Sequence, residues 1–287
     1  MIVFRAIGRF FARIWRWIKE TAWVQPLLIV GSIFGIIFSI PYLTKWVKSW
    51  FKSESASEKY YSKKQLKLKG AADHNSEADK LFDYVLSYDH PENNASTIES
   101  GKKKYGEKFF LTLVQENCAA CEERYEAFET LEKEWNKGSY SGLDGNFKLY
   151  TIYVDTKDDD VNLFEKVYER PEVTKFFENT ISYMMGDYAE HPYRNNTDPE
   201  SYDSNLKNLM DRDEISTPVT FLFDFTQNNP ADWTNEYGVR EVLFSFSGQN
   251  GTDKFAKART LRDAWINNWA DDANAGKDNV FSTRYGK

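Results

Sequence analysis

The chain has 287 residues, of which 41% are hydrophobic and 16% are aromatic, so it can bury a substantial core and is not an intrinsically disordered chain. Its formal net charge is -7, and residues 1–52 carry eight basic side chains against one acidic side chain, so the remainder is strongly acidic. An acidic domain lacks the basic face that phosphate binding needs, which argues against nucleic acid as the main ligand. With two cysteines and three scattered histidines, the chain lacks the ligands of a structural zinc site and the cysteines of a disulfide scaffold. We expect neither a metal nor a bound cofactor.

Residues 1–22 have the pattern of a basic amphipathic helix. At about 100° per residue, their basic side chains fall within one arc of about 120°, and apolar and aromatic side chains take the other side. Such a helix is suited to lie on an anionic leaflet, and these leaflets face the cytoplasm. The alternative is that it merely begins the membrane segment that follows. The basic arc consists of Arg5, Arg9, Arg13, Arg16 and Lys19.

Residues 23–43 contain no charged side chain and are predicted to form a transmembrane helix. About 20 apolar residues, at a rise of ~1.5 Å each, cross a hydrocarbon core ~30 Å thick. A cleaved signal peptide is the alternative, but the apolar run is too long and no small-residue cleavage pattern is present. We therefore expect a single-pass protein of the cell membrane that contacts membrane lipid. The basic helix favours a cytoplasmic N-terminus and an extracytoplasmic C-terminal domain, although basic residues also follow the span.

Within the span, Gly31, Gly35 and Ser39 repeat every four residues. Small residues at this spacing let two membrane helices approach closely, which favours self-association or packing against a partner helix. The alternative is that glycine is simply common in membrane helices.

Residues 44–105 are predicted to be a tether and a helical lead-in. Residues 53–74 are rich in Ser, Glu and Lys, which is typical of a polar linker. Residues 76–88 then show apolar positions at helical spacing.

From residue 106 onward, apolar runs typical of buried strands alternate with helical patterns. This order of elements predicts an α/β fold with a mixed sheet. The predicted strands are residues 109–114, 147–154, 219–225 and 241–247, and the main predicted helices are residues 118–135, 161–185 (divided or kinked at Pro171) and 253–270.

Cys118 and Cys121 lie between a predicted strand and the helix that follows it. Unpaired N–H groups and the positive end of the helix dipole stabilise a thiolate at such a position, and the thiolate is the species that attacks disulfides. A spacing of three residues lets Cys121 resolve a mixed disulfide formed by Cys118. Three neighbouring carboxylates oppose the thiolate, and the sequence leaves open which effect dominates. A static disulfide, two inert thiols and a metal half-site shared between two chains are the alternatives.

The order strand, CxxC, helix, strand, helices, then Thr217-Pro218 before a hairpin and a last helix resembles the thioredoxin superfamily. The resemblance spans about residues 108–270 and implies a thioredoxin-like domain over residues 106–272, followed by a C-terminal tail at residues 273–287. It also implies a cis Thr217–Pro218 bond facing Cys118, where an extended substrate segment would bind. A helical insert at about residues 161–212 is similar to that of Dsb-type extracytoplasmic oxidoreductases.

The chain departs from the thioredoxin pattern beside the cysteines. Asn117 replaces the usual tryptophan, Ala119-Ala120 replaces Gly-Pro, and Thr112 occupies the place of the buried acid. These differences argue against efficient, thioredoxin-like reduction.

The run from Asp155 to Glu165 superficially resembles a calcium-binding loop. It lacks the glycine that an EF-hand loop needs at its turn, so we expect a solvated, acidic helix start instead.

These patterns favour a membrane-tethered thiol–disulfide oxidoreductase that acts on extracytoplasmic protein thiols or disulfides, with Cys118 and Cys121 as catalytic residues and Thr217 and Pro218 as substrate-binding residues. The alternative is a non-enzymatic adaptor, or scaffold subunit of a membrane protein complex, that uses a thioredoxin-like fold for binding.

Overall fold

A computed structural model describes residues 55–138, 143, 145–186, 199–211, 215–226, 235–244 and 254–266. The described residues belong to one compact unit, Ser55–Lys287. The predicted amphipathic helix, the transmembrane helix with its Gly31, Gly35 and Ser39 spacing, and the C-terminal tail lie outside them. Within the described ranges, no helix combines the length and the hydropathy that crossing a bilayer requires.

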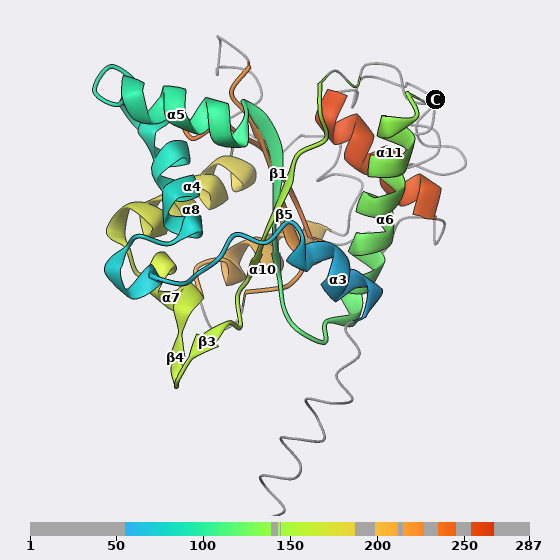
Figure 1. The fold of residues 1–287 in the computed structure, drawn as a ribbon, viewed down its shortest axis with the longest axis horizontal. Helices are drawn as coiled ribbons and strands as arrows, with labels where there is room; N and C mark the ends of the chain where they lie inside the picture. Colours follow the sequence, from blue (N-terminus) through green and yellow to red (C-terminus); the bar gives the residue numbers. More distant parts are fainter. Residues whose placement is uncertain are drawn as a thin grey trace, which may run out of the picture. The chain divides into compact units, whose positions relative to one another are not determined.

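The centre of the unit is a four-stranded mixed sheet with the strand order β2-β1-β5-β6 (Figure 1). Strand β1 pairs in parallel with β2 and antiparallel with β5, and β5 pairs antiparallel with β6. The predicted α/β class with a mixed sheet is therefore confirmed. The strands are β1 (Lys108–Val114), β2 (Leu149–Tyr153), β5 (Val219–Asp224) and β6 (Val239–Leu243).

Helices cover both faces of the sheet, which explains why β1 and β5 are apolar at successive positions. Neighbouring strand residues point to opposite faces. The ring of Phe110 contacts Phe128 of α6 (Ala119–Asn136) and Trp265 of α11 (Lys254–Ile266). The ring of Phe109 instead stacks on Phe223, which contacts Phe176 of α8 (Pro171–Met185). Figure 1 shows α6 beside α11 on one side of the sheet and α8 beside α4 (Glu77–Leu86) on the other.

Residues 55–105 pack into the same unit as the sheet, which corrects the prediction of a polar tether for residues 55–74. Helix α3 (Ala56–Ser62) begins with a capping box at Ser55 and packs on α6, with Tyr61 only 1% exposed. Leu66 N–H then donates to Thr151 at 2.8 Å, and Thr151 N–H donates to Lys64 at 3.0 Å. These bonds cover the outer edge of β2, which would otherwise expose unpaired backbone groups.

The remainder of this N-terminal segment leads into β1. After α3 the chain forms the 3-10 helix η1 (Ala71–Asp73), helix α4, the 3-10 helix η2 (Ser87–Asp89) and helix α5 (Ala95–Tyr105). The predicted lead-in helix over residues 76–88 thus corresponds to α4 and η2.

Between β2 and β5 the described residues form a hairpin and three helices. Pro171 divides the predicted helical stretch, as expected, because α7 (Leu163–Tyr168) ends before it and α8 begins at it. Helix α10 (Pro199–Asn208) follows. The acidic run does not start a helix as predicted. It forms the hairpin of β3 (Lys157–Asp158) and β4 (Val161–Asn162), and α7 starts only after Asn162 has capped it.

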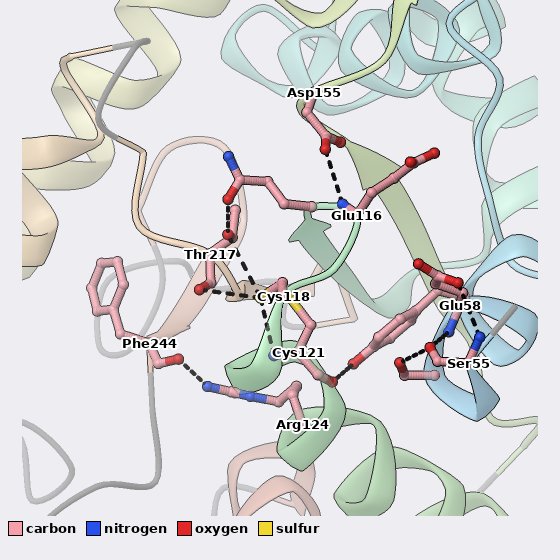
Figure 2. Close-up of a disulfide and its surroundings, with 12 residues drawn as sticks. Ser55, Glu58, Glu116, Cys118, Cys121, Arg124, Asp155, Thr217 and Phe244 are labelled. Carbon is pink, nitrogen blue, oxygen red and sulfur yellow. Dashed lines mark hydrogen bonds between the residues drawn. A yellow bond between two sulfur atoms is a disulfide. The ribbon is translucent and has the colours of Figure 1, made fainter. Parts of the chain in front are cut away.

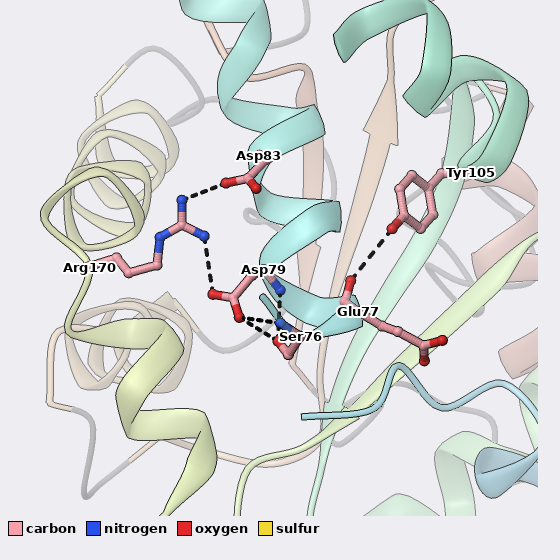
Figure 3. Close-up of polar contacts among 6 residues, drawn as sticks. All are labelled: Ser76, Glu77, Asp79, Asp83, Tyr105 and Arg170. Atoms are coloured by element: carbon pink, nitrogen blue, oxygen red, sulfur yellow. Dashed lines mark hydrogen bonds and ion pairs between the residues drawn. The ribbon is translucent and has the colours of Figure 1, made fainter. Parts of the chain in front are cut away.

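On the side of the sheet that α4 and α8 cover, an ion cluster joins these two helices (Figure 3). Arg170, the residue before α8, donates to Asp79 at 3.1 Å and also contacts Asp83. Asp79 is fully buried and also accepts from Ser76 at the start of α4. Because each partner is hydrogen-bonded, the cluster fixes the two helices against each other without leaving a buried charge unpaired.

The buried acid Asp263 is expected to make the folded chain less stable as the pH rises. Burial raises the pKa of Asp263 in α11 to about 8, although Arg262 donates to the same carboxylate and favours its charged form. In the unfolded chain an aspartate titrates near about 3.9, so the folded chain holds one extra proton between about pH 4 and pH 8. The free energy of unfolding therefore falls as the pH rises through this window, by at most about 1.4 kcal/mol per pH unit. Above about pH 8 this group causes no further fall.

The Asp263→Asn variant lacks this titration, so thermal melting of both proteins at pH 5, 6, 7, 8 and 9 tests the effect. The melting temperature of the parent chain relative to the variant is expected to fall from pH 5 to pH 8 and then to level off. A difference that is constant over the whole range would contradict the raised pKa.

Candidate functional site

Cys118 and Cys121 lie where β1 gives way to α6, and a disulfide joins them with a Cα–Cα distance of 5.2 Å. Cys118 is the N-cap residue of α6, and its Sγ accepts a hydrogen bond from the N–H of Cys121 at 3.1 Å. Cys118 is half-buried, whereas Cys121 is only 3% exposed. A ligand can therefore approach Cys118 more easily, and a thiolate formed there would have helix N-terminal N–H groups beside it.

The carboxylates that oppose a thiolate in the sequence point outward. Glu116, Glu122 and Glu123 are all exposed, and Glu123 accepts from Lys257 of α11 at 3.2 Å. Water and salt screen the charges of exposed side chains strongly. The N–H of Cys121, at the start of the helix, instead donates directly to Cys118 Sγ. The three carboxylates therefore oppose a thiolate at Cys118 only weakly.

A buried arginine lies one helical turn after Cys121, and sequence reasoning did not identify it. Arg124 is 1% exposed, and its guanidinium donates to the carbonyl of Phe244 (Figure 2). It also donates to Thr220 Oγ1 at 3.5 Å. Thr220 Oγ1 also lies 3.0 Å from Thr112 Oγ1, so hydroxyl groups and a cation stand where the family resemblance implies a carboxyl group. A buried cation favours a nearby negative charge. The spacing of the residues was the available signal for its burial. Arg124 lies on the same face of α6 as Ala127, Phe128 and Leu131, and that face is buried.

Helix α3 supplies a second contact that the sequence did not predict. The hydroxyl of Tyr61 donates to the carbonyl oxygen of Cys121 at 3.1 Å. Burial raises the pKa of Tyr61 far above its usual value, so the hydroxyl stays protonated and remains a donor. Tyr61 therefore holds the first turn of α6 in place from the segment that the sequence indicated to be a tether.

The predicted substrate-binding residues lie beside the disulfide. The Thr217–Pro218 bond is cis, and Pro218 immediately precedes β5. The carbonyl oxygen of Thr217 lies 3.7 Å from Cys118 Sγ (Figure 2). The hydroxyl of Thr217 donates to Gln115 Oε1 at 2.8 Å. The structure thus brings Cys118, Cys121 and Thr217 together from positions about 100 residues apart in the chain.

The groups around Cys118 Sγ are the N–H of Cys121 and the carbonyl and hydroxyl oxygens of Thr217. Across the parts of the chain that the structure describes, no group of three or more His, Cys, Asp or Glu side chains is arranged to hold a metal ion. A peptide held against the backbone of Thr217 would lie within reach of Cys118 Sγ, close enough for disulfide exchange. Comparison of the chain with known protein families, curated proteins and solved structures gives no match.

Proposed function

We propose that this chain is a membrane-tethered thiol–disulfide oxidoreductase with a thioredoxin-like domain, acting on extracytoplasmic protein thiols or disulfides. The observation that carries the proposal is the position of Cys118. It is half-buried at the start of α6, its Sγ lies 3.7 Å from the carbonyl of Thr217, and its disulfide partner Cys121 is buried behind it.

The order of elements supports the thioredoxin-like assignment. A CxxC pair follows β1, helix α6 leads to the parallel strand β2, and the antiparallel pair β5 and β6 follows a cis proline. The hairpin and the helices α7, α8 and α10 lie between β2 and β5, where the resemblance implies a helical insert. In this proposal the insert shapes the surface that substrates meet.

The two cysteines have different roles in the exchange. When the disulfide is closed, a substrate thiolate attacks Cys118 Sγ, the Cys118–Cys121 bond breaks, and Cys121 leaves as a thiolate that takes up a proton. When the pair is reduced, the Cys118 thiolate attacks a substrate disulfide and Cys121 resolves the mixed disulfide. The N–H groups at the start of α6 support thiolate formation at Cys118, and the neighbouring carboxylates are exposed to water, which weakens their opposition.

The proposal includes the sequence-based expectations for residues 1–54. A basic helix on the inner leaflet and a single transmembrane span would hold the domain outside the cytoplasm, in a compartment where disulfides form and persist. The Gly31, Gly35 and Ser39 face would pack against a second copy or a partner helix.

Trapping in cells tests this function against the adaptor alternative. The Cys121→Ala variant cannot resolve mixed disulfides, so it is expected to accumulate higher-mass adducts that thiol reductant removes. The Cys118→Ala, Cys121→Ala double variant is the matched control and should show none. If the single variant forms no adducts and the same proteins copurify with the parent chain and the double variant, the chain acts as an adaptor instead.

A further inference from the structure

A cavity of about 510 Å³ adjoins the cysteine site. Gln115, in the loop after β1, and Ile215, two residues before Thr217, form part of its lining. Because the hydroxyl of Thr217 donates to Gln115, the cavity is joined directly to the residue that faces Cys118. The β3–β4 hairpin and the beginning of α7 provide much of the remaining lining.

Asp155 lines this cavity, and among the described residues only one of its two carboxylate oxygens accepts a hydrogen bond. Its Oδ2 accepts from the N–H of Glu116 at 3.0 Å, which fixes the carboxylate against the loop that leads to Cys118 (Figure 2). Its Oδ1 is buried and, within the described ranges, has no hydrogen-bond partner. A buried carboxylate oxygen without a donor is unfavourable, so a positive charge placed close to this carboxylate would be stabilised.

The charges of the lining favour a cationic donor. Asp155, Asp160 and Glu165 contribute three carboxylates. Of the two lysines, Lys166 already donates to Glu169 at 2.9 Å, which leaves Lys157 as the main opposing charge. The chain beyond residue 52 is also strongly acidic, so its field attracts positively charged partners.

We propose that this cavity is a specificity subsite that binds a lysine or arginine side chain near the reactive cysteine of a substrate protein. The cationic group pairs with the partly exposed carboxylate of Asp155, and the aliphatic stem packs on Ile215 and Val161, of which Val161 is 44% exposed. The inference rests on the proposed oxidoreductase function and names the substrates that the site prefers.

The reaction that reports on the subsite is the reduction of the disulfide by cysteine peptides. One peptide thiolate attacks Cys118 Sγ and forms a mixed disulfide, while Cys121 leaves and is protonated. A second peptide thiolate attacks the peptide sulfur of that mixed disulfide and releases Cys118. Two peptide thiols are oxidised to one peptide disulfide, and the protein disulfide is reduced to two thiols.

The experiment uses the oxidised full-length chain in detergent and cysteine peptides that differ at one position. Lysine, glutamine or glutamate is placed at each of the three positions on either side of the cysteine, and the rate of disulfide loss is measured at low and high salt. At its best position, the lysine peptide is expected to react roughly tenfold faster than the glutamate peptide at low salt, and the difference should shrink at high salt.

Two variants with the same change in charge localise the effect. Asp155→Asn keeps an acceptor for the Glu116 N–H but is expected to remove most of the preference for lysine. Asp158→Asn changes an exposed residue of β3 outside the lining and should preserve the preference. The preference is the ratio of the lysine-peptide rate to the glutamate-peptide rate within each variant, so a general change in disulfide reactivity cancels. Asp158→Asn should react with neutral dithiothreitol at the parent rate, which shows that its disulfide is intact.

Three outcomes would overturn the subsite. Equal rates for all peptides, with normal reaction toward dithiothreitol, would exclude it and leave the oxidoreductase function standing. An equal loss of preference in both variants would assign it to the general acidity of the surface, and a preference that Asp155→Asn leaves unchanged would assign it elsewhere. Failure of the disulfide to react with dithiothreitol or any peptide would instead contradict the proposed function.

Discussion

Replacing Cys118 with serine is expected to reduce disulfide exchange by the purified chain to the rate measured without protein. A serine hydroxyl does not form the thiolate that attacks a disulfide, and the remaining thiol of Cys121 is only 3% exposed. The Cys121→Ser variant keeps the accessible half of the pair. It should therefore react once with a disulfide substrate and stop as a mixed disulfide at Cys118.

Mass spectrometry of the intact variants after incubation with glutathione disulfide measures this asymmetry. One glutathione adduct is expected on Cys121→Ser, and much slower modification is expected on Cys118→Ser. Equal rates of adduct formation would show that the two thiols are equally accessible, which contradicts the assignment of Cys118 as the attacking residue.

Among the substitutions considered, the largest loss of unfolding free energy is expected at a buried acid at the end of β5. Asp224 lies between Arg240, at 2.7 Å, and Lys108, at 2.9 Å, and its side chain is fully buried. Burial alone would raise the pKa of Asp224, but Arg240 and Lys108 outweigh it, so the pKa lies below its usual value. The carboxylate is thus charged at neutral pH and balances two cations, of which Arg240 is only 2% exposed.

The Asp224→Ala variant is expected to lose about 3–5 kcal/mol of unfolding free energy, because it leaves the guanidinium of Arg240 buried without its counter-charge. Denaturant unfolding of the full-length chain measures the loss. The Glu129→Ala variant is the matched control, since its partner Lys133 is exposed and the pair should contribute less than about 1 kcal/mol. Equal losses in the two variants would contradict the importance of the buried cluster.

The parts of the fold that depend on local pattern could be predicted from the sequence. The apolar runs that became β1, β2 and β5 are buried on both faces of the sheet, and such runs are recognisable without knowledge of their neighbours. Pro171 ended a helix for a purely local reason, the lack of a backbone N–H.

The features that the sequence did not indicate depend on distant contacts. Helix α3 has only seven residues and a polar composition, and it is held by contacts such as that of Tyr61 with Cys121. The hairpin in the acidic run has two residues in each strand, too few to show alternation.

The candidate site follows the same division between local and distant contacts. The sequence pattern predicted that Cys118 and Cys121 lie at the start of a helix. The family resemblance predicted that Thr217 and Pro218 lie beside them, with a cis bond. Arg124 lies at the spacing of the buried face of α6, but that spacing does not show that its guanidinium is buried against Thr220, which is distant in the sequence. The cavity lined by Asp155 was missed because its lining comes from segments that only the folded chain brings together.

The most direct test of the central claim is a redox titration of the full-length chain in detergent. The protein is equilibrated in glutathione buffers of graded potential, and the free thiols are counted by alkylation, with the Cys118→Ser, Cys121→Ser double variant as the blank. The account predicts fast, reversible closure of one disulfide, with a midpoint between about -270 and -120 mV, which is the range of catalytic CxxC proteins. A disulfide that remains closed below about -300 mV, or thiols that never pair, would make the two cysteines structural and contradict the proposed function.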